Sequence, residues 1–192
     1  YIVGNGEDLT VVDLGPALSE HIEAIVSSSS NLSRIIVTHT HPDHSPGVSL
    51  LQAKVDIPAY GLITETTKNQ DTSFKPAKML THGEVIEAED HAFEVIHTPG
   101  HASNHLCYLL REEKLLFTGD HIMNGSTVVI APPDGNMKDY LESLKMLKDY
   151  DLENIAPEHG ELLCKLQAVA DWIVEDRLER EEKVIESIKK AK

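Results

Sequence analysis

The chain has 192 residues, of which 41% are hydrophobic, and its 17 Lys and Arg stand against 32 Asp and Glu, a formal net charge of −15. This length and composition fit one folded domain with a sizeable core. The acidic balance excludes a broad electrostatic attraction for duplex DNA or anionic lipid, and no apolar run reaches the ~20 residues that a bilayer crossing requires. We therefore expect a protein that binds neither membranes nor duplex DNA.

The two cysteines, Cys107 and Cys164, show no spacing typical of a disulfide framework or a thiolate metal site. A reducing cytoplasm is the expected location. The first residue is Tyr1 rather than Met, and it already lies in a predicted strand, so we expect native sequence to precede it.

Short runs rich in β-branched residues predict strands bounded by turn-forming residues. In chain order they are Tyr1–Val3, Leu9–Val12, Arg34–Val37, Val85–Glu87, Phe93–Ile96, Leu106–Leu110, Leu115–Phe117 and Thr127–Ile130. The connections Gly4–Asp8 and Arg111–Lys114 predict two β-hairpins. Thr127–Pro133 leaves two interpretations open: an edge strand that ends at a proline, or a loop that faces the substrate.

Helical spacing of apolar residues predicts helices at Ala17–Ser27 and Gly47–Lys54. A third helix is predicted after Asn136, a residue type that caps helix N-termini, and its apolar face comprises Leu141, Leu144 and Leu147. A fourth is predicted within Glu161–Lys190. Because strands interleave with helices throughout, we expect a layered α/β fold with the helices outside packed sheets.

The most informative segment follows the predicted strand that ends at Val37. It contains three histidines and an aspartate within six positions: His39, His41, Asp43 and His44. Imidazole and carboxylate are suitable ligands for zinc and similar first-row metals. His39 and His41 point the same way in an extended segment, whereas Asp43 and His44 follow a proline that allows the chain to turn. The segment could therefore serve two neighbouring ions.

Four further residues occupy the ends of predicted strands beside glycine or proline. His101, Asp120 and His159 are candidate metal ligands, and Asp13 has the same context. Asp13 could be a turn-forming residue or a support behind the ligands, and we favour the supporting role.

His39-Thr40-His41-Pro42-Asp43-His44 resembles the HxHxDH signature of the metallo-β-lactamase superfamily, and the remaining candidates follow in the family's order. The resemblance implies an αββα sandwich with a dinuclear metal site at one edge. It further implies two divalent ions, with zinc as the expected metal, and a hydroxide between them. The chain would then be a metal-dependent hydrolase, with Asp120 and Asp43 as catalytic residues.

The same resemblance implies a role for each ligand. His39, His41 and His101 would bind the first ion, and Asp43, His44 and His159 the second. Asp120 would bridge both ions, and Asp13 would hold the HxHxDH loop by hydrogen bonds. His105 could support the site or simply be a hydrogen-bonded core residue. The other histidines are expected to be structural or exposed: His21, His82, His91, His97 and His121.

Several segments resemble the bacterial relatives of lactamase-β-like protein 2, the branch similar to ribonuclease Z: Thr38–Gly47, Gly100–Cys107, Gly125–Tyr140 and Arg177–Ile188. This branch implies a metallo-β-lactamase domain over residues 1–175. Residues 176–192 would form a C-terminal helix leading toward a winged-helix-like domain. It also implies a short single-stranded RNA or a small ester as substrate, cleaved by the hydroxide.

Three alternatives remain open: a glyoxalase-II-like thioester hydrolase, a metal-binding module without catalysis, and iron-dependent oxygen chemistry. No basic cluster follows Asp120 to grip a glutathione-type anion, which counts against the first. The zinc β-lactamases carry a cysteine where this chain has Asp120, so antibiotic hydrolysis is disfavoured. The flavodiiron proteins usually carry a glutamate where this chain has His41, so iron redox chemistry is disfavoured as well.

Overall fold

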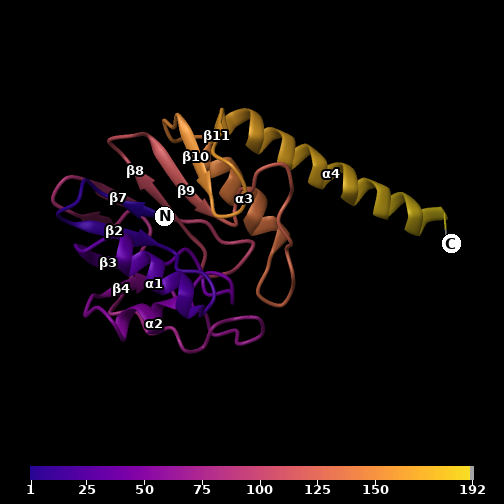
Figure 1. Ribbon diagram of the computed structural model, residues 1–192. Helices are drawn as coiled ribbons and strands as arrows, with labels where there is room; N and C mark the ends of the chain where they lie inside the picture. The colour runs from indigo at the N-terminus through magenta and orange to yellow at the C-terminus, as the bar shows by residue number, and fades with distance from the viewer. Residues whose placement is uncertain (191–192) are drawn as a thin grey trace.

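The computed structural model describes residues 1–190, which form two sheets between two layers of helices (Figure 1). The first sheet has the strand order β1-β2-β3-β4-β5, and the second has the order β11-β10-β9-β8-β7-β6. The bounds of the first sheet are β1 Ile2–Val3, β2 Leu9–Val12, β3 Leu32–Ile36, β4 Ala59–Gly61 and β5 Lys78–Met79. Those of the second are β6 Val85–Glu87, β7 Ala92–His97, β8 Leu106–Leu110, β9 Leu115–Gly119, β10 Asn154–Pro157 and β11 Leu163–Cys164.

Neighbouring residues of the central strands pack into different hydrophobic cores, because successive side chains of a strand point to opposite faces of its sheet. Val11 packs with the helices α1 (Ser19–Ser28) and α2 (Gly47–Gln52), whereas Val12 packs between the sheets. Likewise Val95 lies between the sheets, and Ile96 packs against the helices of the other side. Three apolar layers thus produce the αββα sandwich that the sequence predicted.

The outer helices of the second sheet are α3 (Met137–Leu147) and α4 (Leu166–Lys190). Asn136 caps α3 as predicted, since its side chain accepts hydrogen bonds from the N–H groups of Lys138 and Asp139. The carboxyl-terminal part of α4 extends away from the sandwich (Figure 1). No helix in the described part of the chain is both long and apolar enough to cross a membrane.

Both predicted hairpins are confirmed, because β1 pairs with β2 and β8 with β9 in antiparallel fashion. The sequence missed four strands, namely β4, β5, β10 and β11. All four are short, with two to four residues each, and carry few β-branched side chains. Their strand conformation comes from pairing with neighbours, as for β10 alongside β9.

The prediction of a strand at Thr127–Ile130 was wrong, because these residues form an irregular loop. Their carbonyl groups bind side chains instead of a neighbouring strand: Val129 accepts a hydrogen bond from His101, and Val128 from Arg177. The last helix, predicted within Glu161–Lys190, begins at Leu166, because Leu163–Cys164 pairs with β10. The predicted C-terminal segment 176–192 is helical through Lys190, and its residues 191–192 lie outside the described part.

Candidate metal centre

The candidate ligands come from loops that follow strands of both sheets. The HxHxDH segment lies just beyond β3, and His101 lies on the loop after β7. Asp120 directly follows β9, and His159 follows β10, which runs parallel to β9. Because parallel strands present their carboxyl ends at the same edge, the structure brings these distant segments together at one end of the sandwich.

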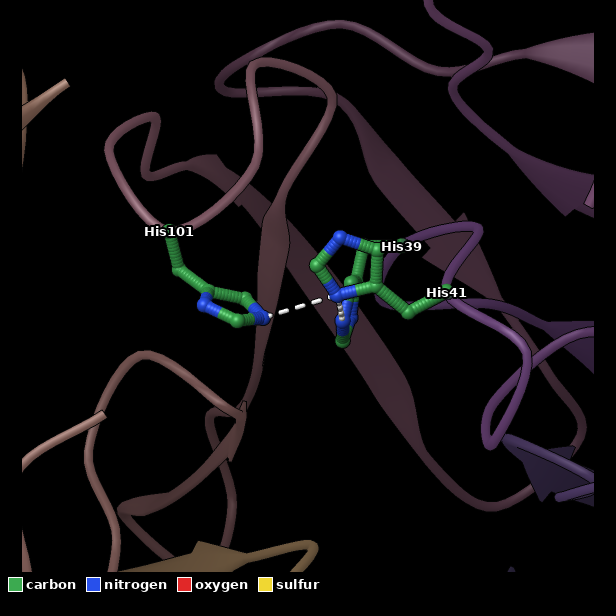
Figure 2. Close-up of side chains that lie close together, drawn as sticks. All are labelled: His39, His41 and His101. Atoms are coloured by element: carbon green, nitrogen blue, oxygen red, sulfur yellow. Dashed lines mark hydrogen bonds between the residues drawn. The ribbon is translucent and has the colours of Figure 1, made fainter. Parts of the chain in front are cut away.

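The first donor group consists of His39, His41 and His101, whose ring nitrogens converge on one point (Figure 2). Nδ1 of His41 lies 3.0 Å from Nε2 of His39 and 2.9 Å from Nε2 of His101. Three imidazoles around a tetrahedral zinc ion, with bonds of ~2.0–2.1 Å, would place their nitrogens about 3.3 Å apart. The spacing of these nitrogens is close to that value, so the group fits a single ion.

The second donor group consists of Asp43, His44, Asp120 and His159. Nε2 of His159 lies 3.3 Å from Oδ2 of Asp43 and 3.5 Å from Oδ1 of Asp120. Nε2 of His44 lies 3.4 Å from the same Asp120 oxygen. Both His44 Nε2 and Asp120 Oδ1 are buried and have no hydrogen-bond partner among the described residues. Unpaired buried polar atoms are costly, and a cation between them would satisfy both.

The carboxylate of Asp120 faces both groups at once. Its Oδ1 belongs to the second group, whereas its Oδ2 lies 3.6 Å from Nε2 of His101 in the first. The side chain is only 10% exposed, which confines it between the two groups. This is the arrangement that a bridging ligand requires.

Asp13 adopts φ = 49° after β2 and holds the HxHxDH segment from behind. Its Oδ1 accepts a hydrogen bond from the Thr38 N–H at 2.8 Å, and its Oδ2 accepts one from the Thr38 hydroxyl at 2.6 Å. Oδ2 also accepts from Nδ1 of His44 at 2.8 Å. Since Nδ1 of His44 carries the proton, Nε2 is left as a free lone pair toward the second group.

Similar contacts orient the first group. The Thr38 hydroxyl lies 3.0 Å from Nδ1 of His39 and, because it donates to Asp13, it accepts from that nitrogen. Nδ1 of His101 donates to the carbonyl of Val129 at 2.7 Å. Both contacts leave Nε2 free to bind an ion. The sequence analysis missed Thr38 and Val129, although Thr38 directly precedes His39 and offers a hydroxyl at the strand end.

The electrostatics of the site favour a bound cation. Burial lowers the pKa of His39 well below its usual value, and burial together with His101 lowers that of His41 to about 4, so this group presents neutral rings. Burial also disfavours the charged form of His44, but the carboxylates of Asp120 and Asp13 outweigh it and raise its pKa to about 11, so a metal ion at this position would replace the proton on Nε2. Positive charge beside these carboxylates is therefore strongly stabilised.

The histidines outside the two donor groups range from exposed to solvent to buried against other side chains. His21 and His82 are exposed, and His97 is half-buried. His91 is buried and lies within hydrogen-bond distance of Thr10 and Asp90, neither of which belongs to a donor group. Buried His121 packs against Tyr140. His105, the uncertain case, contacts the backbone of Asp120, which gives it a place behind the site.

Together, the sandwich and the two donor groups define a metal-binding α/β protein. A family model described as the metallo-beta-lactamase superfamily matches residues 1–159. The chain belongs to this superfamily, and membership together with the donor groups implies bound divalent metal ions.

Similar proteins include an atrochrysone carboxyl ACP thioesterase from Aspergillus fumigatus, 30% identical over 198 residues that cover 100% of this chain and 44% of that protein. The beta-lactamase-like protein 2 homolog of Caenorhabditis elegans is 29% identical over 198 residues, covering 98% of this chain and 64% of the homolog. The crystal structure of TTHA1623 in a di-iron-bound form has a TM-score of 0.72 and 25% identity, covering 85% of this chain and 88% of that one. The chain thus spans about half to two thirds of the curated relatives it matches.

Proposed function

We propose that this chain hydrolyses a small thioester with the help of two divalent metal ions, zinc above all, held by the two donor groups. The observation that carries hydrolysis is the position of Asp120, with one carboxylate oxygen toward each group. The thioester is favoured by the relatives, several of which are named thioesterases and match the whole length of this chain. The similarity to the endoribonuclease branch stays a prediction.

The metal ions would lower the pKa of a water molecule and polarise the thioester carbonyl. Asp120 can act as the proton acceptor. Burial opposes its ionisation, but the nearby His44 outweighs burial and lowers its pKa, so the carboxylate is ionised near neutral pH. A general base of this kind contributes about 10²–10⁴-fold. Water adds its oxygen to the carbonyl carbon, the carbon–sulfur bond breaks, and the proton passes to the leaving thiolate.

The surface around the site suits a small substrate. A cavity of about 250 Å³ begins at His41, Asp43 and His101, and a second of about 450 Å³ begins at Asp43, Asp120 and His159. Asp43 and His159 are the exposed members of the donor groups, with 54% and 45% of their side chains accessible. A thioester could therefore lie across them with one half in each cavity. The net charge of −15 gives no comparable surface for a nucleic acid.

The test is turnover of pentanoyl-N-acetylcysteamine by the zinc-loaded protein, with release of thiol as the signal. We expect Asp120→Ala to lose about a hundredfold or more in kcat. The control is Asp56→Ala, since Asp56 is exposed and precedes β4, at the opposite end of the sandwich from the site. A short single-stranded RNA is assayed in parallel. Metal-dependent RNA cleavage without thioester turnover would overturn the proposal and support the endoribonuclease alternative.

A further inference from the structure

The smaller cavity has a mixed lining. Its floor carries His41 and His101 of the first donor group, and one wall is apolar, with Val129, Pro132 and Pro133 from the loop before α3. This wall suits the hydrocarbon part of a ligand that reaches the donor groups with its polar end.

Another part of the lining is formed by the loop that carries Lys68 and Asn69. Asn69 adopts φ = 59°, which turns the chain directly after Lys68. The next two residues fix this turn to the metal-ligand segment: Gln70 Oε1 accepts a hydrogen bond from the Thr40 hydroxyl at 2.5 Å, and the Asp71 N–H donates to the Thr40 carbonyl at 2.6 Å. Thr40 lies between His39 and His41, so the loop is anchored next to two candidate ligands.

Asp134 ties these parts of the lining together. Its Oδ2 accepts hydrogen bonds from Nε2 of Gln70 at 3.0 Å and from the Ser103 N–H at 3.2 Å. Its Oδ1 accepts from the hydroxyls of Ser103 at 2.6 Å and Thr64 at 3.2 Å. The loop of Lys68, the loop of His101 and the apolar wall are thus joined through one carboxylate. These side-chain hydrogen bonds hold the loop of Lys68 against the other segments that line the cavity.

Lys68 is the one Lys or Arg among the described residues that line either cavity. The two carboxylates of its own cavity have other partners: Asp134 accepts the four hydrogen bonds above, and Asp43 faces His159. Lys68 is exposed at the wall of this cavity, where it is a suitable partner for an anionic group of the ligand.

We propose that this cavity binds the acyl half of the thioester, and that Lys68 recognises a carboxylate at the far end of that acyl group. The inference rests on the proposed function. The acyl half is assigned here because this is the smaller cavity, while the larger one, lined by Met123, Ser126 and Thr127, can hold a longer thiol. The substrate class is thus the thioester of a dicarboxylic acid.

The experiment compares glutaryl- and pentanoyl-N-acetylcysteamine, which share a five-carbon acyl chain and differ in the terminal carboxylate. Lys68→Met should lower kcat/KM for the glutaryl substrate by up to about fivefold, the range of an exposed ion pair, and Lys68→Glu should lower it further. The pentanoyl substrate should change less than twofold. The glutaryl preference should also shrink in 0.5 M salt, because added ions screen an exposed pair.

Lys54→Met is the matched control, since Lys54 is exposed at the end of α2 and pairs with Glu23. Suppose that the wild type hydrolyses both substrates while Lys68→Glu leaves the ratio of the glutaryl to the pentanoyl kcat/KM unchanged. That result would overturn this inference alone. An equal fall for both substrates would show a structural effect and overturn it too. If the wild type hydrolyses neither thioester, the proposed function fails, and this inference fails with it.

Discussion

The backbone N–H of Asp120 donates a hydrogen bond to Nε2 of His105, 3.2 Å away. The other ring nitrogen of His105 lies 2.9 Å from the Thr98 hydroxyl. Burial and the neighbouring histidines lower the pKa of His105 well below its usual value, so the ring is neutral. Nδ1 therefore carries the proton and donates to Thr98, while Nε2 accepts from Asp120. His105 holds the main chain of the residue that faces both donor groups.

His105→Ala should lower kcat about tenfold and leave the Asp120 N–H unpaired, at a cost of about 1–3 kcal/mol in stability. His105→Gln supplies a side-chain acceptor and should recover part of kcat. Kinetics with the zinc-loaded variants and urea unfolding measure the two effects. If Ala and Gln behave alike in kcat, His105 is a packing residue and does not position Asp120.

The protein should bind close to two divalent ions per chain, because three histidines form one group and four further residues the other. Elemental analysis after zinc loading and gel filtration measures the ratio. Removal of metal by a chelator should lower the melting temperature, since ligands that bind only the folded state stabilise it by about 2.7 kcal/mol at a hundredfold excess over Kd. A ratio near one would assign weak binding to the more exposed second group, and a ratio near zero would refute the metal centre.

Asp13→Ala should destabilise the metal-free protein by about 3 kcal/mol or more, because three buried hydrogen bonds lose their acceptor. Asp13→Asn should cost less, since its amide oxygen can still accept from Thr38 and Asn tolerates the positive φ at this position. Urea unfolding compares the two variants. Equal stability of Asp13→Ala and wild type would show that the HxHxDH loop does not depend on this carboxylate.

Gly100→Ala should be strongly destabilising, because a Cβ at Gly100 would lie 2.3 Å from Cα of Tyr140 at the start of α3. Gly125→Ala is the matched control: Gly125 also has a positive φ, of 71°, but nothing lies within 4 Å of its added Cβ. The control should lose only about 1–2 kcal/mol of backbone strain. Thermal unfolding and soluble yield compare the variants, and similar losses in both would contradict the steric argument.

Asp8 should contribute to stability only above acidic pH. Its hydrogen bonds to Arg34 and Ser33 lower its pKa from 3.8 to about 2. A carboxylate with a depressed folded-state pKa stabilises fully above its unfolded pKa, and this stability is lost as the pH falls through about 2. The stability difference between wild type and Asp8→Asn in urea should therefore shrink between pH 5 and pH 2. A difference that stays constant over this range would contradict the pKa.

The sequence predicted well those elements whose own residues carry a clear signal, such as a run of β-branched residues or a helix-capping residue. The strands Leu9–Val12, Val85–Glu87 and Leu106–Leu110 are confirmed to the residue, and so is the Asn136 cap. In contrast, Asn154–Pro157 offers little β-branched pattern and becomes a strand only beside β9. Thr127–Ile130 has the pattern of a strand, yet side chains from elsewhere occupy its carbonyl groups.

The sequence by itself determined the fold class, because strands and helices alternate in a recognisable pattern. It also predicted the candidate metal ligands, because a dense group of His and Asp residues at strand ends has no role in packing. Only the tertiary structure decided the rest: that the two oxygens of Asp120 face different groups, that His105 binds the Asp120 backbone, and that Lys68 lies in the wall of a cavity beside His101. These relationships join residues that are far apart along the chain, or they depend on how a side chain is rotated. No local pattern encodes them, since they arise when two sheets pack and their loops meet at one edge.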